Sequence, residues 1–249
     1  MGSFNRCIVI VHRPESPEGA GGRVRAALED DFHHFRVELG HDGDQVLRLD
    51  ALALRHPYSL CPSAAEPLQQ LVGMALDGLA GAISHRTEAR LQCTHLLDLA
   101  GLAIAAAAQR RARRRYDIAV PDRIDGMTRP RLDRDGEPLL QWQLHDAMIT
   151  GPEPFSGVPL HQGLARWALQ TLSADDAEAA LALRRCAMIS LGRAKDLDAQ
   201  RHAVATGHCH VQQPQRAALA LRVVGSTHDF SARTGELCAA DAGWLDFGV

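Results

Sequence analysis

Apolar and polar residues alternate along the first part of the chain as they do in half-buried β-strands. Residues 7–12 are rich in Ile and Val and predict a short strand. Between residues 33 and 39, one face carries His33 followed by apolar side chains, and a second apolar-rich segment covers residues 46–54. The turn sequence Asp42-Gly43 lies between these two segments, and this pattern predicts a β-hairpin.

Apolar residues at helical spacing follow the predicted hairpin. Ser63 and Glu66 form a capping box for a helix that ends before Gly78. Thr94 is the expected N-cap of a second helix, whose last turns are the basic run 110–115, because cations there complement the helix dipole. Further helices are predicted over residues 160–172, 175–191 (with Ser173 as N-cap) and 215–223.

Strand patterns return in the second half of the chain. Apolar residues flank the turn sequence Asp135-Gly136, which is typical of a β-meander. The strands predicted in this half cover residues 116–120, 131–133, 139–144 and 208–212.

Hairpins with helices clustered between them predict the fold class. This order is typical of an α+β protein, here antiparallel β-hairpins and a meander packed with several α-helices. The chain is predicted to form a single domain over residues 1–249. The alternative division has two sub-halves, residues 1–115 and 116–249.

Composition narrows the class of protein. The chain has 249 residues, of which 46% are hydrophobic and 23% charged, as in ordinary globular proteins. A formal net charge of −3 argues against a general polyanion binder, so no nucleic-acid partner is expected. The longest apolar run, residues 96–108, contains Asp98 and is too short to cross a bilayer, so no membrane partner is expected. No hydrophobic export segment opens the sequence, and a cytoplasmic location is therefore expected.

The cysteines are spread widely through the chain. There are six, and none forms a C-x-x-C pair, so the sequence predicts reduced thiols and neither a zinc ribbon nor a disulfide framework. Any metal site must therefore combine residues from distant segments. The sequence also lacks the common nucleotide-binding and serine-hydrolase patterns.

The start of the second predicted helix carries the most informative candidates. If Thr94 is the N-cap, Cys93 lies just before the helix and His95 in its first turn, so both can converge at the positive end of the helix. That end lowers the pKa of a thiol and favours the thiolate. Asp98 lies one turn beyond His95 and could orient its second ring nitrogen. The alternative is a capped helix with an incidental Cys and His.

Other candidates lie elsewhere in the sequence. His33 is on the apolar face of its strand, where a satisfied core histidine is the alternative interpretation. Cys61 is in an extended connector, where a buried structural cysteine is equally common. His208 and His210 would share a face if their segment is a strand, which makes them an alternative ligand pair.

Several of these residues resemble the pattern of a known bacterial family. Cys93-Thr94-His95-Leu96, followed by Asp98-Leu99, resembles the hallmark of the domain of unknown function numbered 2889. The family's upstream elements are matched by Pro57-Tyr58, Cys61-Pro62, Leu71-Val72-Gly73 and by His33 at the head of a strand that turns at Asp42. The similarity is best from about residue 32 to 101, and it implies one shared functional centre containing His33, Cys61, Cys93 and His95.

Two enzyme hypotheses follow, both for small-molecule catabolism. In the first, His33, Cys61, Cys93 and His95 hold a divalent transition metal, with zinc the expected ion. Four protein ligands would make a structural site, whereas three and a water would permit lyase or hydrolase chemistry on a carbonyl or acyl compound. In the second, no metal is needed: Cys93 is the nucleophile, and His95 or His33 is its acid–base partner in lyase, isomerase or thioester chemistry.

A third hypothesis is a metal-free small-molecule binding protein, whose pocket carries these side chains without catalysis. An enzyme is favoured over this alternative, and both stay open. The expected partner is a small-molecule substrate, and assembly into a homo-oligomer is left open as well.

Overall fold

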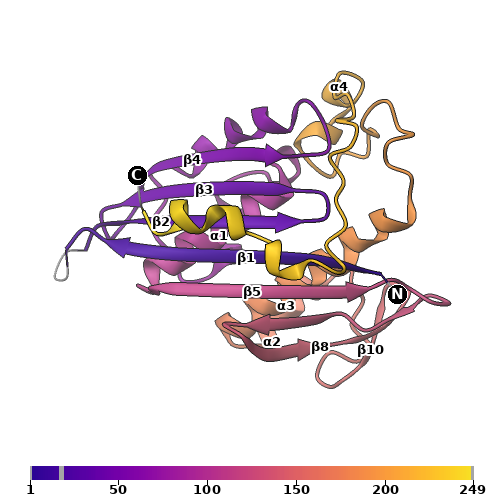
Figure 1. The fold of residues 1–249 in the computed structure, drawn as a ribbon. Helices are drawn as coiled ribbons and strands as arrows, with labels where there is room; N and C mark the ends of the chain where they lie inside the picture. The colour runs from indigo at the N-terminus through magenta and orange to yellow at the C-terminus, as the bar shows by residue number, and fades with distance from the viewer. Residues whose placement is uncertain (1, 17–19, 248–249) are drawn as a thin grey trace. The chain divides into compact units, whose positions relative to one another are not determined.

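The protein is described here by a computed structural model that covers residues 2–16 and 20–247. Seven strands form one antiparallel sheet in the order β4-β3-β2-β1-β5-β7-β8, and three strands form a second in the order β10-β9-β6 (Figure 1). Helices accompany both sheets. This arrangement confirms the predicted α+β class.

The strands lie between residues 3 and 151. The larger sheet contains β1 (Ser3–Pro14), β2 (Gly22–Asp30), β3 (His34–His41), β4 (Val46–Arg55), β5 (Arg113–Pro121), β7 (Arg131–Arg134) and β8 (Glu137–Gln141). The smaller sheet contains β6 (Met127–Thr128), β9 (Gln143–His145) and β10 (Met148–Gly151).

The helices lie between β4 and β5 and after β10. The α-helices are α1 (Thr94–Ala108), α2 (Leu164–Thr171), α3 (Ala174–Ile189), α4 (Pro214–Ala217) and α5 (Ala242–Leu245). The 3-10 helices are η1 (Cys61–Ala65), η2 (Pro67–Leu71), η3 (Ala80–His85), η4 (Ala89–Leu91), η5 (Ser190–Ala194), η6 (His210–Gln212), η7 (Thr234–Glu236) and η8 (Ala239–Asp241). None of the helices in the described part of the chain has both the length and the apolar character needed to cross a lipid bilayer.

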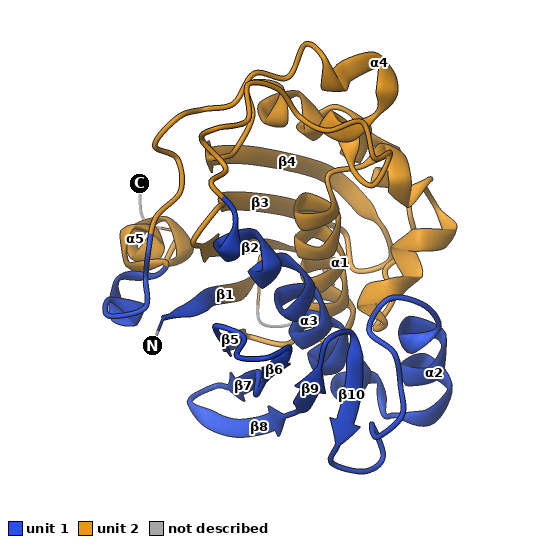
Figure 2. Cartoon of the chain, turned by 90° about the vertical axis from the view of Figure 1, so that its right-hand side faces the viewer, with its two compact units in different colours: residues 1–7, 115–195, 229–237 blue, residues 8–114, 196–228, 238–249 orange. Residues whose placement is uncertain are grey.

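Contacts divide the chain into two compact units, each built from separate segments (Figure 2). Unit 1 contains residues 1–7, 115–195 and 229–237, and unit 2 contains residues 8–114, 196–228 and 238–249. Two of the boundaries fall inside β1 and β5, and the others lie outside the strands. The single-domain prediction, with its alternative halves, stays a prediction.

The core of unit 2 forms between its strands and α1. Phe35, Val37 and Leu39 alternate along β3 and are almost completely buried. Helix α1 is nearly all Ala and Leu, so its small, apolar surface packs closely on β2 and β3. Figures 1 and 2 show α1 on one face of these strands and α5 on the other. Helix α1 therefore covers one face of β2 and β3.

Unit 1 has its own core. The cis peptide bonds Gly151-Pro152 and Glu153-Pro154 lie in the loop after β10. Ser173 caps α3 by accepting the backbone N–H of Asp176, as predicted. Helix α3 packs on β7 and β8. The buried ring of Trp142 lies 5.3 Å from that of Phe155, which closes the core beside the second sheet.

The predicted hairpin is confirmed as β3 and β4, which pair antiparallel. The strand before it, β2, was not predicted. Its residues Ala26, Ala27 and Leu28 are all buried, so β2 shows no alternation of apolar and polar positions to reveal it. The meander turn is confirmed, since Asp135 and Gly136 both adopt positive φ between β7 and β8.

Some helix boundaries were predicted wrongly. The segment from Ser63 forms η1 and η2 instead of an α-helix; Pro67 has no N–H to donate and begins the second 3-10 helix. Helix α1 ends at Ala108, and the basic run continues into β5 after Arg110 adopts a positive φ of 50°.

Two predictions near the end of the chain are also corrected. Residues 208–212 do not form a strand, since His210–Gln212 is the 3-10 helix η6. The helix predicted over residues 215–223 is shortened to α4, Pro214–Ala217. Both errors come from short apolar segments, for which periodicity does not distinguish strand from helix.

Candidate metal centre

A tight turn between β2 and β3 positions the first two candidate ligands. Oδ1 of Asp30 accepts the backbone N–H groups of Phe32 and His33, at 2.7 and 2.8 Å. The backbone N–H of Asp30 in turn donates to the carbonyl of His33. This turn holds the two side chains together: Nδ1 of His33 lies 3.1 Å from Oδ1 and 3.4 Å from Oδ2 of Asp30. Asp30 is completely buried.

Helix α1 supplies the third residue. His95, in its first turn, stacks on His33 with the ring centroids 4.0 Å apart and an angle of 29° between the planes. Phe35 flanks both rings, at 5.3 Å from His33 and 6.0 Å from His95. Each histidine is 8% exposed. Two imidazoles and one carboxylate therefore share a site that is almost completely buried.

The geometry of this cluster suits a metal ion. One ligand atom from each of Asp30, His33 and His95 can be chosen so that all three lie within 4.8 Å of one another. Two histidines and one carboxylate are a ligand set of zinc enzymes and of non-haem iron enzymes. The donor set thus fits the divalent transition metal that the sequence predicted, with Asp30 in place of the cysteines.

Arg55, at the end of β4, holds the turn between β2 and β3 by hydrogen bonds to its backbone. Its guanidinium donates to the backbone carbonyls of Asp30, Asp31 (3.0 Å) and His33 (3.3 Å). The Arg55 side chain is 12% exposed, so these bonds are largely protected from water. They restrict the backbone that carries Asp30 and His33.

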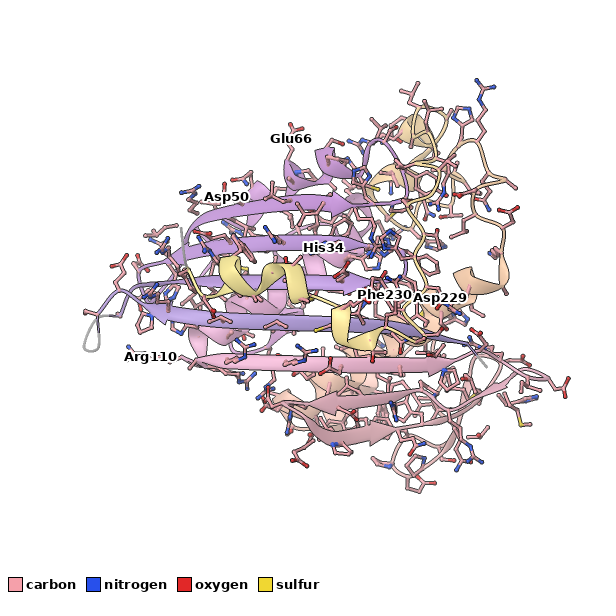
Figure 3. All side chains as sticks on the ribbon, viewed as in Figure 1. His34, Asp50, Glu66, Arg110, Asp229 and Phe230 are labelled. Carbon is pink, nitrogen blue, oxygen red and sulfur yellow. The ribbon has the colours of Figure 1, made fainter. Side chains whose placement is uncertain are left out.

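A second group of carboxylates and histidine lies next to the first in sequence, and Figure 3 labels its His34 at the start of β3. Nε2 of His34 lies 2.9 Å from Oδ2 of Asp241, and Nδ1 lies 3.7 Å from Glu29. Arg36 binds Asp241 at 2.6 Å, and Arg55 binds Glu29 at 3.3 Å. Because a guanidinium already neutralises each carboxylate, this group is an ion-pair network and a poor cation site.

Asp241 illustrates the balance within this ion-pair network. Burial raises the pKa of the Asp241 carboxyl, but the hydrogen bonds and charges of His34 and Arg36 outweigh it and hold the pKa below its ordinary value. The network fastens η8 and α5 to the outer face of β2 and β3. Arg25 adds a hydrogen bond to the carbonyl oxygen of Trp244.

The predicted cysteines Cys61 and Cys93 lie outside the two groups of potential metal ligands found among the described residues. Cys93, and not Thr94, is the N-cap of α1. It is buried, as is Cys61 in η1, and the charges of both interact with that of Cys209. The two predicted thiols therefore have a third thiol as their neighbour.

The expected thiolate at Cys93 is opposed by burial. Burial raises the pKa of the Cys93 thiol to about 12, while the backbone N–H groups of Leu96 and His95 at the helix N-terminus lower it. Burial also raises the pKa values of Cys61 and Cys209. Helix polarity acts in the predicted direction, but it is weaker than desolvation.

The remaining predicted residues have different outcomes. Asp98 lies in α1 one turn after His95, and its charge helps to raise the pKa of Cys93; its role toward His95 stays a prediction. His208 is exposed while His210 is buried and hydrogen-bonded to Ser63, so the two do not share a strand face. The predicted strand is wrong, so the shared face on which the alternative ligand pair depended is absent from this segment.

Sequence reasoning missed Asp30 and Arg55. The signal for Asp30 was local: an Asp three residues before a His, with a turn between them, is typical of an Asx turn. Arg55 has no such local signal, because its role comes from the pairing of β4 with β3.

One comparison with known proteins gives a match to part of the chain. The family model described as "Protein of unknown function (DUF2889)" matches residues 14–109 of the chain. The comparison with curated proteins gives no match. Asp30, His33, Arg55 and His95 all lie within the matched segment. The predicted resemblance to this family is therefore confirmed over residues 14–109 of the chain.

Proposed function

We propose that the protein is an enzyme of small-molecule catabolism that uses a divalent transition metal held by Asp30, His33 and His95. The observation that carries this proposal is the stacked pair of histidines beside a fully buried carboxylate. A cluster of this kind costs free energy to bury, because its polar groups lose water, and a bound cation offsets that cost. Zinc is the first ion to test.

The donor set favours catalysis over a closed structural site. Three protein ligands leave at least one coordination position for water or substrate. The metal, when bound, supplies Lewis-acid activation of a carbonyl or acyl group and of a water molecule. Asp30 and the turn around it fix the His33 ring, and Phe35 limits the rotation of both imidazoles. Hydrolysis or elimination on a carbonyl or acyl compound is therefore the proposed reaction class.

Burial limits the size of the substrate. His33 and His95 are each 8% exposed, so only a small compound, or one end of a larger one, reaches them. Restricted access also keeps bulk water away from the reacting groups and strengthens electrostatic interactions there. The proposed substrate is accordingly a small carbonyl or acyl molecule.

The metal-free alternatives have less support from the geometry. Cys93 is 9% exposed and belongs to no cluster with His33 or His95 among the described residues. A cysteine nucleophile needs an acid–base partner within hydrogen-bond reach. The alternatives nevertheless make distinct predictions, and the same experiment covers them.

The test compares histidines of the proposed metal centre, His33 and His95, with His34, which neighbours His33 in sequence but belongs to the ion-pair network. Untagged protein is loaded with Zn²⁺, dialysed and analysed for metal, and His33→Ala and His95→Ala are measured beside the control His34→Gln. We expect bound metal at this site in the wild type and in His34→Gln, and at least tenfold weaker binding in the other two variants. Co²⁺ substitution adds a visible spectrum that reports histidine and carboxylate ligation.

Activity is then measured on small esters, thioesters and hydroxy acids with and without metal. Metal-dependent turnover that is lost in His33→Ala and kept in His34→Gln supports the proposal. Binding that is unaffected by His33→Ala and His95→Ala contradicts it. In that case, rapid alkylation of Cys93 would favour the cysteine enzyme, and an inert thiol the binding protein.

A further inference from the structure

Three distant segments of unit 2 meet at His210. Its Nε2 atom lies 2.9 Å from Oγ of Ser63, and its backbone N–H donates to the carbonyl of Gln92 at 2.9 Å. Its Nδ1 atom lies 3.3 Å from the carbonyl oxygen of Leu91. These contacts join η1, the end of η4 and the start of η6 in one buried region.

Each of these segments carries a cysteine next to the contact. Cys61 lies two residues before Ser63, Cys93 follows Gln92, and Cys209 precedes His210. Cys209 packs against the buried cluster that contains Cys61. The charge of Cys61 interacts with those of Cys93 and Cys209, and the charge of Cys93 interacts with that of Cys209. Three thiols from three segments therefore share one region of the interior.

We propose that Cys61, Cys93 and Cys209 form a second metal site, distinct from the Asp30–His33–His95 cluster, that takes a thiophilic ion of the zinc class. Thiolates are the protein ligands preferred by such ions, and zinc sites with three cysteines and one other ligand are common. The positive end of α1 lies at Cys93 and stabilises the excess negative charge of three thiolates on one divalent ion.

Packing alone explains this convergence less well. A single buried cysteine often acts as a small apolar residue. Here Cys61 and Cys209 share an apolar cluster, and polar contacts of His210 also join their segments to the backbone just before Cys93. Gln213 reinforces the junction by donating to the carbonyls of Arg90 and Cys209.

Metal binding at this site requires the three sulfur atoms to move closer together. The reaction itself needs no oxidant. In the described part of the chain, the three sulfur atoms are not all within 4.8 Å of one another. Rotation about each Cα–Cβ bond moves a sulfur between staggered positions, and the proposal requires such rotations to bring the three sulfur atoms together. Three S–H protons leave to solvent as three sulfur–metal bonds form, and neither sulfur nor metal changes oxidation state.

The test uses Cd²⁺, because thiolate ligation of this ion produces an ultraviolet charge-transfer band that histidine and carboxylate ligands do not. The full-length reduced protein is titrated with Cd²⁺, and the band is recorded for Cys209→Ser, Cys61→Ser and the control Cys186→Ser in α3. We expect the band in the wild type and in Cys186→Ser. We expect at least a tenfold loss of affinity in the other two variants. Cys209→Ala provides a second, apolar replacement if Cys209→Ser unfolds.

The two proposed sites fail separately in this experiment. The band should survive in His33→Ala and His95→Ala, whatever happens to zinc at the first cluster. A band that is absent from the wild type, or that persists unchanged in Cys209→Ser and Cys209→Ala, overturns the thiol site and leaves the proposed function untouched.

Discussion

Oδ1 of Asp30 lies 3.1 Å from Nδ1 of His33 and also accepts the backbone N–H of the same residue. One carboxylate therefore builds the turn and faces the imidazole. Asp42, in the next turn of the chain, repeats only the first role: its Oδ1 accepts the N–H groups of Asp44 and Gln45, both at 2.9 Å. Comparing Asp30 with Asp42 therefore separates the effect of forming the turn from the effect of supplying a metal ligand.

Asp30→Asn should retain the turn and lose the metal. The amide oxygen can still accept both backbone N–H groups, so we expect the free energy of unfolding to change by about 1 kcal/mol. Metal affinity should fall at least tenfold, because the charged ligand is gone. Asp30→Ala loses both functions, and leaving buried donors unsatisfied should cost about 1–3 kcal/mol. Urea unfolding and metal titration measure the two effects.

Asp42→Ala is the matched control for this pair. It should reduce stability by loosening an exposed turn, and it should leave metal affinity unchanged, because Asp42 does not belong to the Asp30–His33–His95 cluster. Equal loss of metal binding in Asp42→Ala and Asp30→Asn would mean that the turns act through stability alone.

Arg55→Gln should weaken the metal centre from the far side of the turn. The guanidinium binds three carbonyls of the segment that carries Asp30 and His33, and outer partners of metal ligands typically contribute 10–100-fold to affinity. We expect a loss of about tenfold in metal affinity and an altered Co²⁺ spectrum. Arg48→Gln, on the same strand with a 74% exposed side chain, is the control and should change neither.

The sequence predicts parts of this centre whose signals are local. Alternation from His33 to Leu39 correctly identifies β3, and the buried stripe after Cys93 correctly identifies α1. His95 therefore comes from a correctly predicted helix and His33 from the turn just before a correctly predicted strand, and the structure brings them together. The resemblance that joined them to Cys61 and Cys93 contains no information on which side chains touch.

The missing parts depend on contacts between distant segments. The second half of β2, which ends at Asp30, is buried on both faces, so no alternation of apolar and polar positions is visible there. The capping box at Ser63 is a genuine local signal, but Pro67 interrupts the helix that it would begin. Cys209 lies 116 residues after Cys93, and nothing in the spacing indicates that the two thiols share a region.

His12 and His41 form a contact that predicts a loss of stability at acidic pH. Nε2 of His12 lies 3.1 Å from Nε2 of His41, and the pair passes over Gly22, where a Cβ would lie 2.8 Å from His12. Burial lowers the pKa of both histidines; Arg110 lowers both further, while Asp42 and Glu15 act in the opposite direction on His41. The folded protein thus favours the neutral pair.

The sign of the pH effect follows from linkage. A histidine whose pKa is lowered by folding binds fewer protons in the native state, so stability is complete above the ordinary pKa of about 6.5 and declines as the pH falls through it. We expect the free energy of unfolding to fall between pH 8 and 5, and to fall less in His12→Gln. His161→Gln, an exposed site, should keep the wild-type slope. A wild-type profile that is flat over this range contradicts the prediction.

Gly101→Ala tests the packing that places His95. A Cβ at residue 101 would overlap the carbonyl oxygen of Ala80 and lie 2.8 Å from Cδ1 of Ile83, so α1 and η3 would have to separate. Alanine gains about 1 kcal/mol in helix propensity, but the overlap with backbone should cost about 1–3 kcal/mol and outweigh it. Because α1 carries His95, its displacement should also weaken metal binding. Gly243→Ala, where no atom lies within 4 Å of the new Cβ, is the control in α5 and should not destabilise. If Gly101→Ala is as stable as the wild type and binds metal equally well, α1 and η3 do not pack as closely as described, and the position of His95 is set by its contacts with β3 alone.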